Sequence, residues 1–534
     1  MHVHELWIEE FKNLRDVGVE FDKESPYTVL VGENGSGKSN FIEALAWIFR
    51  NLDLEEPAPF GYEIKYRCRG NDVRVKASKG NMPEFWVRSI DAEAFEEVHK
   101  SKFMSVDSDE RPNYRPAFVF GYYSGPSDRL ASLFEKHRER FYRLIIQPEA
   151  KRVTKTVHSN ALRRLFYAQT LHGQFALLAF FMQAAGGESD REFLRDHLQI
   201  DGLDSVLFAL RRPPWRRRGG DPRFWNAEGE VREFLSRLYD ASMVPMRMDR
   251  RISVDLTKNP SVECLYLFLP NVSALGEVYK SYENQYAFFT ALESTHISKL
   301  LAEVRTRVRV SPAMGGGAIT YRDLSEGEQQ LLLVLGLLKF TAEEETLFLL
   351  DEPDTHLNPA WSVQYLSFLD RFIERRDSCH IVMSTHDPLV FSRLLRPQVR
   401  IFRREESGKV RVEQPQQDPR GMGVQAILTS DLFRLRSTLD LYTQGDLDRQ
   451  RELASKKDEL SGDEKTELEE LNKKLYSLSL TSRDPLYELF LRKWNEREKP
   501  EWKSATELTP QQLKDREDLA VQIAGELEKE RSGR

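Results

Sequence analysis

Eight residues near the start of the chain have the types and the spacing that bind phosphate. Gly32 to Ser39 reads Gly-Glu-Asn-Gly-Ser-Gly-Lys-Ser and matches the pattern G-x-x-x-x-G-K-[ST] in full. Glycines let backbone N–H groups close around a phosphate, Lys38 can reach the outer phosphate oxygens, and the Ser39 hydroxyl can ligate Mg²⁺. We therefore predict a nucleotide site here. Its expected contacts are Gly32, Glu33, Asn34, Gly35, Ser36, Gly37, Lys38, Ser39 and Asn40.

Two adjacent carboxylates follow a short apolar run. Leu347 to Leu350 predicts a buried strand, and Asp351 and Glu352 come at its end. In a nucleotide site, Asp351 would hold the Mg²⁺ shell and Glu352 would polarise the attacking water as a catalytic residue. The simpler alternative is that both carboxylates cap the next helix.

His386 follows a second apolar run, in the segment Ser384-Thr385-His386-Asp387-Pro388. A lone histidine is usually a surface residue. Its position directly after a predicted strand favours a contact with the γ-phosphate, so we include His386 among the candidate catalytic residues.

Leu324 to Gln330 reads Leu-Ser-Glu-Gly-Glu-Gln-Gln and predicts the start of a helix. Ser325 and Glu328, three positions apart, have the spacing of a capping box, and Gly327 admits the close approach of another backbone. The N-terminus of such a helix binds anions. Taken alone, the segment is first interpreted as an ordinary helix cap.

The elements that must position these residues can be predicted from their periodicity. An apolar strand at Tyr27–Val31 runs into the glycine loop, and the apolar spacing of Asn40–Phe49 is helical. His4 to Phe21 alternates and predicts two strands with a turn near Lys12 to Asp16. Further strand-like runs are expected to continue one sheet, at Tyr62–Cys68, Val73–Ala77 and Phe118–Tyr123.

The middle of the chain has a mainly helical pattern, from about Arg129 to Val308, and predicts an inserted lobe. The motif-bearing pattern returns after Gly315–Gly317, and Asp446–Leu480 predicts a helical hairpin. The predicted fold class is α/β with a split head. Its parts are a head segment at 1–125, the inserted helical lobe at 126–304, a second head segment at 305–400, and a helical C-terminal region at 401–534.

Composition limits the classes of protein to consider. The chain has 534 residues, 40% hydrophobic and 31% charged, with a net charge of −7, which excludes a uniformly basic nucleic-acid coat. Its longest apolar stretches are about half the ~20 residues that cross a bilayer, so we expect no membrane association. The N-terminus lacks the pattern of a secretion signal, and Cys68, Cys264 and Cys379 lack metal-ligand spacing. We expect a cytoplasmic protein with structural cysteines.

Together the four motifs resemble those of ABC-type ATPases, in the glutamate-containing form found in the SMC, RecF and OLD proteins. The resemblance covers about residues 1–125 and 305–400. It implies ATP and Mg²⁺ as cofactors and an ATP-dependent pair of copies, in which the signature of one closes on the nucleotide held by the other. The residues expected to act in trans are Ser325, Glu326, Gly327 and Glu328. The segment that reads across the pair, the D-loop, would include Asp354, His356 and Asn358.

Within this group, two strings are similar to the ATPase subunit of Septu-type antiphage systems. They are Asp351–Pro359 and Ile427–Phe433 with the hairpin that follows. The resemblance implies a separate HNH-type nuclease subunit as partner and an assembly larger than a dimer. Related ATPases accompany some retrons, so a retron RNA–DNA is another partner to consider. The chain itself shows no nuclease motif.

Two alternatives stay open at this point. A RecF-like repair or chromosome-maintenance ATPase would act on DNA directly, through an arginine-rich loop that is otherwise explained as a solvated connector. Its expected contacts are Arg211, Arg212, Trp215, Arg216, Arg217 and Arg218. The other alternative is a nucleotide-gated scaffold with negligible turnover. For the adenine contacts and the Q-loop residue, Phe11–Leu14 and the stretch after Tyr123 are positional candidates only.

Overall fold

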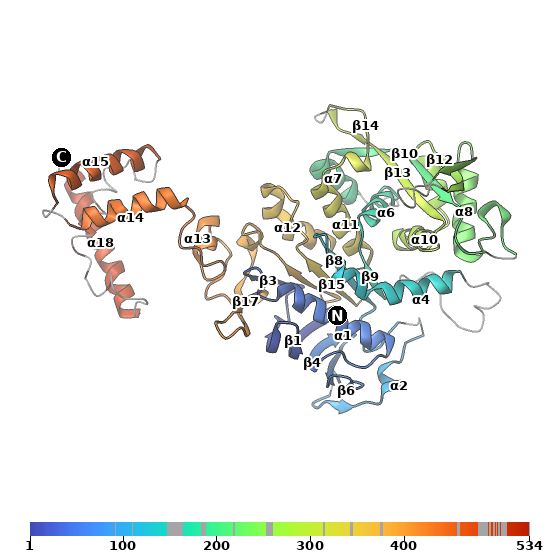
Figure 1. The fold of residues 1–534 in the computed structure, drawn as a ribbon, viewed down its shortest axis with the longest axis horizontal. Helices are drawn as coiled ribbons and strands as arrows, with labels where there is room; N and C mark the ends of the chain where they lie inside the picture. Colours follow the sequence, from blue (N-terminus) through green and yellow to red (C-terminus); the bar gives the residue numbers. More distant parts are fainter. Residues whose placement is uncertain are drawn as a thin grey trace. The chain divides into compact units, whose positions relative to one another are not determined.

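The computed structural model forms two compact units, Met1–Arg434 and Leu435–Arg534. Figure 1 shows the helices and strands of both. The described residues are 1–90, 92–108, 111–146, 164–182, 188–216, 219–251, 260–312, 315–341, 345–373, 377–456, 460–478, 490, 493–494, 497, 499, 502 and 510–532.

The first unit is built around a seven-stranded sheet with the strand order β18-β17-β3-β16-β15-β8-β9. Only β18 pairs antiparallel to its neighbour; the other described pairings are parallel. Every residue of β15 and β16 is buried, which explains their mainly apolar sequences. The bounds are β3 (Tyr27–Gly32), β8 (Phe118–Tyr123), β9 (Leu165–Tyr167), β15 (Thr346–Asp351), β16 (Cys379–Ser384), β17 (Val399–Arg404) and β18 (Val410–Glu413).

A second, antiparallel sheet has the order β2-β1-β4-β5-β6-β7. Its strands alternate buried and exposed residues, because only one face packs on the core. The prediction that Tyr62–Cys68 and Val73–Ala77 continue the sheet of Phe118–Tyr123 was wrong, since these hairpin strands belong to this separate sheet. The bounds are β1 (His2–Phe11), β2 (Leu14–Glu20), β4 (Tyr62–Cys68), β5 (Asn71–Ala77), β6 (Glu84–Ser89) and β7 (Glu96–Glu97).

Helix α1 (Lys38–Leu54) lies between these two sheets (Figure 1). Its apolar residues, such as Phe41 and Leu45, belong to one core cluster with residues of both sheets, among them Ile64 and Leu349. The helix starts directly after the glycine loop, so packing on two sides fixes the end of that loop.

Three helices cover the other face of the seven-stranded sheet: α6 (Thr170–Phe181), α11 (Glu326–Thr341) and α12 (Pro359–Phe372). The helices α6 and α11 pack closely, because a Cβ added at Gly336 would lie 2.3 Å from the Ala176 Cβ. Short helices α2 (Lys100–Phe103), α3 (Arg129–Leu133), α4 (Glu135–Ile145) and α13 (Val424–Thr429) complete the unit around these layers.

The segment predicted as a helical lobe contains helices and also a five-stranded antiparallel sheet, in the order β11-β12-β10-β13-β14. The prediction for 126–304 missed this sheet, and its boundary after residue 304 cuts through β13. The strands are β10 (Ile200–Arg211), β11 (Met246–Arg251), β12 (Ser261–Leu269), β13 (Leu301–Val310) and β14 (Ala318–Thr320). The helices are α7 (Glu188–Leu198), α8 (Gly229–Ala241), α9 (Val272–Tyr279) and α10 (Gln285–Ile297).

The second unit is helical. The region predicted as helical, 401–534, begins inside β17 and includes β18, so its first part, up to Arg434, belongs to the first unit. Helices α14 (Leu441–Ser455) and α15 (Gly462–Ser477) form a hairpin, and α18 (Pro510–Ser532) follows later in the chain. Leu453 and Leu475 are fully buried, and an ion pair of 2.9 Å joins Arg449 to Glu467 across the hairpin. Ser461 begins α15 with a capping box that includes Glu464.

No helix in the described part of the chain is long and apolar enough to cross a membrane. The three cysteines are buried and free. Burial raises the pKa of the Cys68 and Cys379 thiols to about 12, so both stay protonated and unreactive at neutral pH.

Candidate nucleotide-binding and hydrolysis site

The predicted phosphate loop joins the end of β3 to the start of α1. Gly32, Gly35 and Gly37 have φ angles of 151°, 78° and 107°, in a region that residues with side chains rarely adopt. At Gly32 a side chain would also collide with β17, because a Cβ there would lie 2.2 Å from the Phe402 carbonyl oxygen. The loop shape therefore depends on these glycines.

Two polar groups of this loop are buried within it. Lys38 is 5% exposed, and its Nζ donates hydrogen bonds to the carbonyl oxygens of Gly32 and Glu33 at 2.7 and 3.1 Å. Burial lowers the pKa of Lys38 to about 8, against the opposing effect of two nearby carboxylates, so the ammonium is mostly charged at neutral pH. Ser36 is also buried, and its Oγ has no hydrogen-bond partner among the described residues. A buried ammonium and an unpaired hydroxyl suit an anion with several oxygens.

The buried carboxylate of Asp351 lies at the end of β15. Its Oδ1 accepts hydrogen bonds from Ser39 Oγ at 3.0 Å and Ser384 Oγ at 2.5 Å, and its Oδ2 lies 3.2 Å from Arg129 Nη2. Asp351 and Ser384 meet because β15 and β16 are parallel and in register at these residues. A hydroxyl and a carboxylate oxygen are ligands that Mg²⁺ prefers, so Ser39 and Asp351 fit this cation.

Glu352 follows with a backbone φ of 55°, which is uncommon for a residue with a side chain. Its N–H donates to the Ser384 carbonyl and hydroxyl oxygens, at 3.1 and 3.2 Å. Its Oε1 lies 3.3 Å from His386 Nε2. Burial and the nearby Lys38 lower the pKa of His386 against the effect of the carboxylates, so the imidazole is neutral at neutral pH. The carboxylate is thus held in a strained turn, a situation that is typical of functional sites.

The segment predicted as the signature begins α11. Ser325 Oγ donates to Glu328 Oε2 at 2.8 Å, and the Glu328 N–H lies 3.3 Å from Ser325 Oγ. Ser325 and Glu326 are exposed, whereas Gly327 is buried, since a Cβ there would lie 2.4 Å from the His356 carbonyl oxygen. Among the described residues, no hydrogen bond or ion pair connects Ser325–Glu328 with the phosphate loop. The structure therefore does not bring these two predicted parts of the site together within one copy.

The three residues predicted for the D-loop make different contacts. Asp354 is buried and accepts a hydrogen bond from Thr385 Oγ1, and burial raises the pKa of Asp354 to about 7. His356 Nδ1 lies 3.2 Å from Glu326 Oε2. The side chain of Asn358 caps α12 by accepting a backbone N–H at 3.0 Å. This segment therefore joins the end of β16, the start of α11 and the start of α12.

Three residues of the site were not predicted from the sequence. Ser384 could have been found, because a parallel pairing of the two predicted strands places it opposite the Asp351 carboxylate. Arg129 lies after β8, which neighbours β15, and its guanidinium stacks on the Tyr123 ring at 5.5 Å. Asn13 belongs to the turn between β1 and β2, and its Nδ2 donates to the Gly35 carbonyl oxygen at 3.0 Å. Asn13 lies in Phe11–Leu14, and Arg129 lies in the stretch after Tyr123. The sequence had indicated both stretches only as positional candidates for the adenine contacts and the Q-loop residue.

The arginine-rich loop after β10 is only partly available for contacts. Trp215 is half-buried against the core, and its Nε1 donates to the Ser298 carbonyl oxygen at 2.7 Å. The indole is therefore held against the core with only part of its surface exposed, and its contact with a base stays a prediction. Arg212 and Arg216 are exposed, Arg211 is half-buried at the end of β10, and Arg217 and Arg218 lie outside the described residues.

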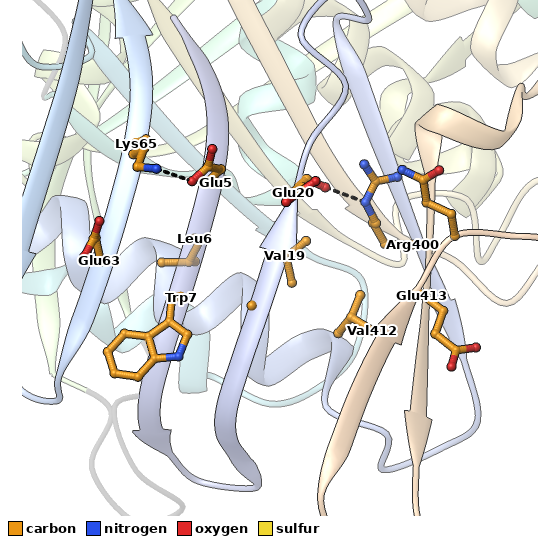
Figure 2. Close-up of a pocket in the computed structure, with 12 residues that line it drawn as sticks. Glu5, Leu6, Trp7, Val19, Glu20, Glu63, Lys65, Arg400, Val412 and Glu413 are labelled. Carbon is orange, nitrogen blue, oxygen red and sulfur yellow. Dashed lines mark hydrogen bonds and ion pairs between the residues drawn. The ribbon is translucent and has the colours of Figure 1, made fainter. Parts of the chain in front are cut away.

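A groove of about 400 Å³ lies elsewhere, between the six-stranded sheet and the strands β17 and β18 (Figure 2). Glu5 forms an ion pair with Lys65 at 2.5 Å, and Arg400 donates a hydrogen bond to the Glu20 carbonyl oxygen. The carboxylates that line it are Glu5, Glu20, Glu63 and Glu413. Such a surface repels phosphate, so this groove does not suit a nucleotide.

Comparison with known protein families finds matches on two parts of the chain. The model of an "AAA ATPase domain" matches residues 1–111, and the model of an "AAA domain, putative AbiEii toxin, Type IV TA system" matches residues 218–392. The Septu protein PtuA of Bacillus mycoides (strain KBAB4) is 27% identical over 124 residues. That stretch covers 22% of this chain and only 17% of the length of PtuA.

The solved structures that this chain matches, at low similarity, include two Smc heads and RecF. The Smc head bound to the C-winged helix domain of ScpA has 13% identity and a TM-score of 0.33, covering 78% of this chain and 97% of that one. The Smc head with an extended coiled coil, bound to a ScpA domain derived from Pyrococcus furiosus, has 12% identity and a TM-score of 0.32, with 77% and 96% covered. RecF with ATP has 12% identity and a TM-score of 0.28, with 77% and 97% covered.

The first AAA model covers the region that contains the glycine loop, and the second covers part of the inserted segment together with the region that contains the Asp351–Glu352 pair. In its motifs and in these sequence matches, the chain resembles the ABC-type ATPases of the SMC, RecF and OLD group and, within that group, the Septu protein PtuA.

Proposed function

We propose that this chain binds ATP with Mg²⁺ and hydrolyses it at the site formed by the glycine loop and the end of β15. The observation that carries this proposal is the 3.0 Å hydrogen bond between Ser39 Oγ and Asp351 Oδ1. This bond joins two side chains that could ligate Mg²⁺, beside a loop whose buried Lys38 suits phosphate. The AAA models that match both halves of the site support the same activity.

Each part of the loop has a separate task in binding. Lys38 would move its Nζ hydrogen bonds from the loop carbonyls to phosphate oxygens, with the backbone N–H groups that follow the glycines around them. The Ser36 hydroxyl gains a partner in the same way. Ser39 and Asp351 would hold Mg²⁺, which neutralises charge on the phosphates. Arg129 balances the second oxygen of Asp351 and so keeps this buried carboxylate compensated.

Glu352 is the proposed general base. Its Oε1 lies 3.3 Å from His386 Nε2, and the neutral imidazole can donate a hydrogen bond that orients the carboxylate. The other carboxylate oxygen is then free to accept a proton from an attacking water. The hydrogen bonds of the Glu352 N–H hold the backbone of this turn, and the contact with His386 Nε2 holds the carboxylate.

The signature completes the site only in a second copy of the chain. Ser325 and Glu326 are exposed at the N-terminus of α11, where the helix presents partial positive charge. In a two-fold pair, each copy would present this helix end to the nucleotide held by the other. Bound ATP would then stabilise the pair, and hydrolysis would release it.

The biological role that these features support best is antiviral defence. The support is the stretch shared with the Septu protein PtuA, together with the strings Asp351–Pro359 and Ile427–Phe433. We propose that the ATP cycle regulates a separate HNH-type nuclease subunit. Capture of the Glu352→Gln variant with ATP in its native host should recover such a nuclease in a fixed ratio. Recovery of repair proteins and DNA, without a nuclease, would contradict this role.

The ATPase proposal is tested with Glu352→Gln, which keeps the size of the side chain and removes its basicity. We expect phosphate release to fall by a factor on the order of 10²–10⁴, because general-base catalysis contributes about that much. Binding of a fluorescent ATP analogue should persist, since Glu352 is not among the phosphate ligands.

The matched control is Glu96→Gln, which removes an exposed carboxylate on β7, away from the site. It should keep the turnover of the unmodified protein. Unchanged turnover in Glu352→Gln would exclude this residue as the general base, and absence of turnover in the unmodified protein would contradict the proposed activity itself.

A further inference from the structure

The five-stranded sheet has one face covered by helices and one face open to solvent. Along β13, Val304, Thr306 and Val308 are buried toward the helices, whereas Arg305, Arg307 and Arg309 are exposed on the opposite face. Residues that alternate along a strand lie about 6.6 Å apart on the same side. The three arginine side chains therefore leave the strand on one face and are here called the arginine row; Arg305 forms an ion pair with Glu303 at 3.0 Å.

Further basic groups join this row from neighbouring elements. Arg250 of β11 and Arg322 after β14 are 52% and 71% exposed, and lie 3.8 and 3.0 Å from Glu303. Asp204 lies 3.8 Å from Arg307. Five arginines thus meet two carboxylates, and Arg309 has no ion-pair partner among the described residues. This face is positive although the whole chain is acidic.

Apolar and aromatic side chains lie beside the arginine row. The strand register aligns Phe268 of β12, Leu207 of β10 and Arg305 of β13 in one line across the sheet. The next line contains Tyr266, and Phe268 is 37% exposed. Two exposed methionines of β11, Met246 and Met248, extend this apolar area to the edge of the sheet.

A row of arginines next to exposed aromatic rings has the chemistry of a surface for single-stranded nucleic acid. Guanidinium groups bind phosphates at successive nucleotides, and aromatic rings stack on unpaired bases whatever their sequence. An acidic protein as the binding partner would account for the arginines, but it would not account for the exposed aromatic side chains. A duplex offers phosphates and no accessible base faces for Phe268 to contact.

We propose that this open face of the five-stranded sheet binds single-stranded nucleic acid, with the arginine row on the phosphates and Phe268 and Tyr266 against the bases. The inference goes beyond the proposed ATPase and does not depend on it. It also places the contact on the sheet, whereas the sequence suggested the loop that contains Trp215.

The test is the triple variant Arg305→Gln, Arg307→Gln, Arg309→Gln of the full chain. Binding of a fluorescein-labelled oligothymidylate of about 30 nucleotides is followed by anisotropy at several salt concentrations. We expect the affinity at low salt to fall on the order of tenfold or more. The slope of log K against log salt should become less steep by about 2, since each lost contact to single-stranded phosphate removes about 0.7.

A control with the same change in net charge is the triple variant Arg396→Gln, Arg404→Gln, Arg411→Gln, at exposed positions around β17 and β18. It should bind the oligonucleotide like the unmodified protein. Phe268→Ala should weaken binding about tenfold with an unchanged salt slope, because it removes stacking and no charge. Thermal melting shows whether each variant keeps its fold.

The outcome that overturns the proposal is equal binding by the two triple variants, and so is a lack of measurable binding by the unmodified protein at about 50 mM salt. Preference for a duplex of the same length over the single strand would overturn it as well. ATP turnover is measured on the same samples. Loss of oligonucleotide binding with unchanged ATP turnover in the arginine-row variant supports the proposal. Absence of ATP turnover in every sample, including the unmodified protein, would contradict the proposed ATPase activity and not the nucleic-acid surface.

Discussion

The nucleotide site and the arginine row place their charged groups in opposite ways. Lys38 and Asp351 are 5% and 2% exposed; Lys38 donates to carbonyl oxygens of its own loop, and Asp351 is paired with Arg129 from another segment of the chain. Arg305 and Arg307 are 52% and 54% exposed and lie along a single strand. Water compensates an exposed guanidinium, whereas a buried charge needs partners at defined positions. The site therefore depends on each of a few residues, and the row depends on the sum of several.

This contrast determines how each region should respond to substitution. A single change among the buried groups should have a large effect, because it leaves another charge or a packed backbone without its partner. A single change in the arginine row should have a small effect that adds to the others. The predictions below begin with the largest expected effect.

Asp53 tests the expectation that a single change at a buried charge has a large effect. It lies near the end of α1 and contacts His137 Nε2 on α4 at 3.0 Å, Arg115 Nη1 at 2.9 Å and Arg164 Nη1 at 3.1 Å. Asp53→Asn should lower the free energy of unfolding by about 4 kcal/mol, because it strands buried positive charge, Arg115 above all. Chemical denaturation followed by tryptophan fluorescence measures this change.

The pH dependence of this effect has a defined sign. Burial alone would raise the pKa of Asp53, but His137, Arg164 and Arg115 hold it well below its usual range. A lowered pKa stabilises the fold above the unfolded value of about 3.9, and this contribution disappears as pH falls through the folded pKa. The difference in the free energy of unfolding between the unmodified protein and Asp53→Asn should therefore be largest at pH 7 and should shrink below about pH 4. Glu233→Gln, in an exposed pair with Arg237, is the control and should change little. A constant difference down to low pH would contradict this assignment.

The second prediction concerns the number of copies that each region needs. All residues of the arginine row come from one copy of the chain, whereas the proposed nucleotide site needs the signature of a second copy. Lys38→Ala should weaken ATP binding about 100-fold, since it removes charge-assisted hydrogen bonds worth about 3 kcal/mol. Ser325→Arg should block the signature and leave the loop intact. In a mixture of the two variants, about half of the pairs are mixed and each holds one intact site, so about a quarter of the turnover should return.

The measurement is phosphate release from equal amounts of both variants, with the mixed pairs confirmed by two different affinity tags. Each variant mixed with itself is the control and should stay inactive. If confirmed mixed pairs show no turnover, the signature does not act on the nucleotide of the other copy.

The same contrast explains what the sequence could predict. The α/β class and the glycine loop follow from local constraints, because a strand, glycines and a lysine must occur in a fixed order around a phosphate. The sheet in the inserted segment was missed, although β13 alternates Val304, Thr306 and Val308 with arginines at a period of two. Its pairing with β10 joins residues about a hundred positions apart, and no local signal reports such a register.

The contacts of Arg129 and Asn13 could not be predicted from the sequence for a related reason. Both reach the site through sheet order, since β8 lies next to β15 and the turn after β1 lies against the loop. A spacing rule describes residues close in sequence, and these groups come from separate segments. The roles of the predicted site residues stay predictions until the variants above are measured.

The smallest predicted effect comes from replacing one glycine hydrogen with a methyl group, at the signature and, as a control, in α9. Gly327→Ala would place a Cβ 2.4 Å from the His356 carbonyl oxygen, so the start of α11 or the D-loop must shift. Such overpacking costs 1–3 kcal/mol, and we expect turnover to fall about tenfold while ATP binding is kept. Gly276→Ala in α9 meets no atom within 4 Å and should raise the melting temperature, because alanine favours a helix over glycine by about 1 kcal/mol. If both variants turn over ATP normally, the close contact between signature and D-loop is not required for turnover. In that case only the charged residues of the site would be individually required.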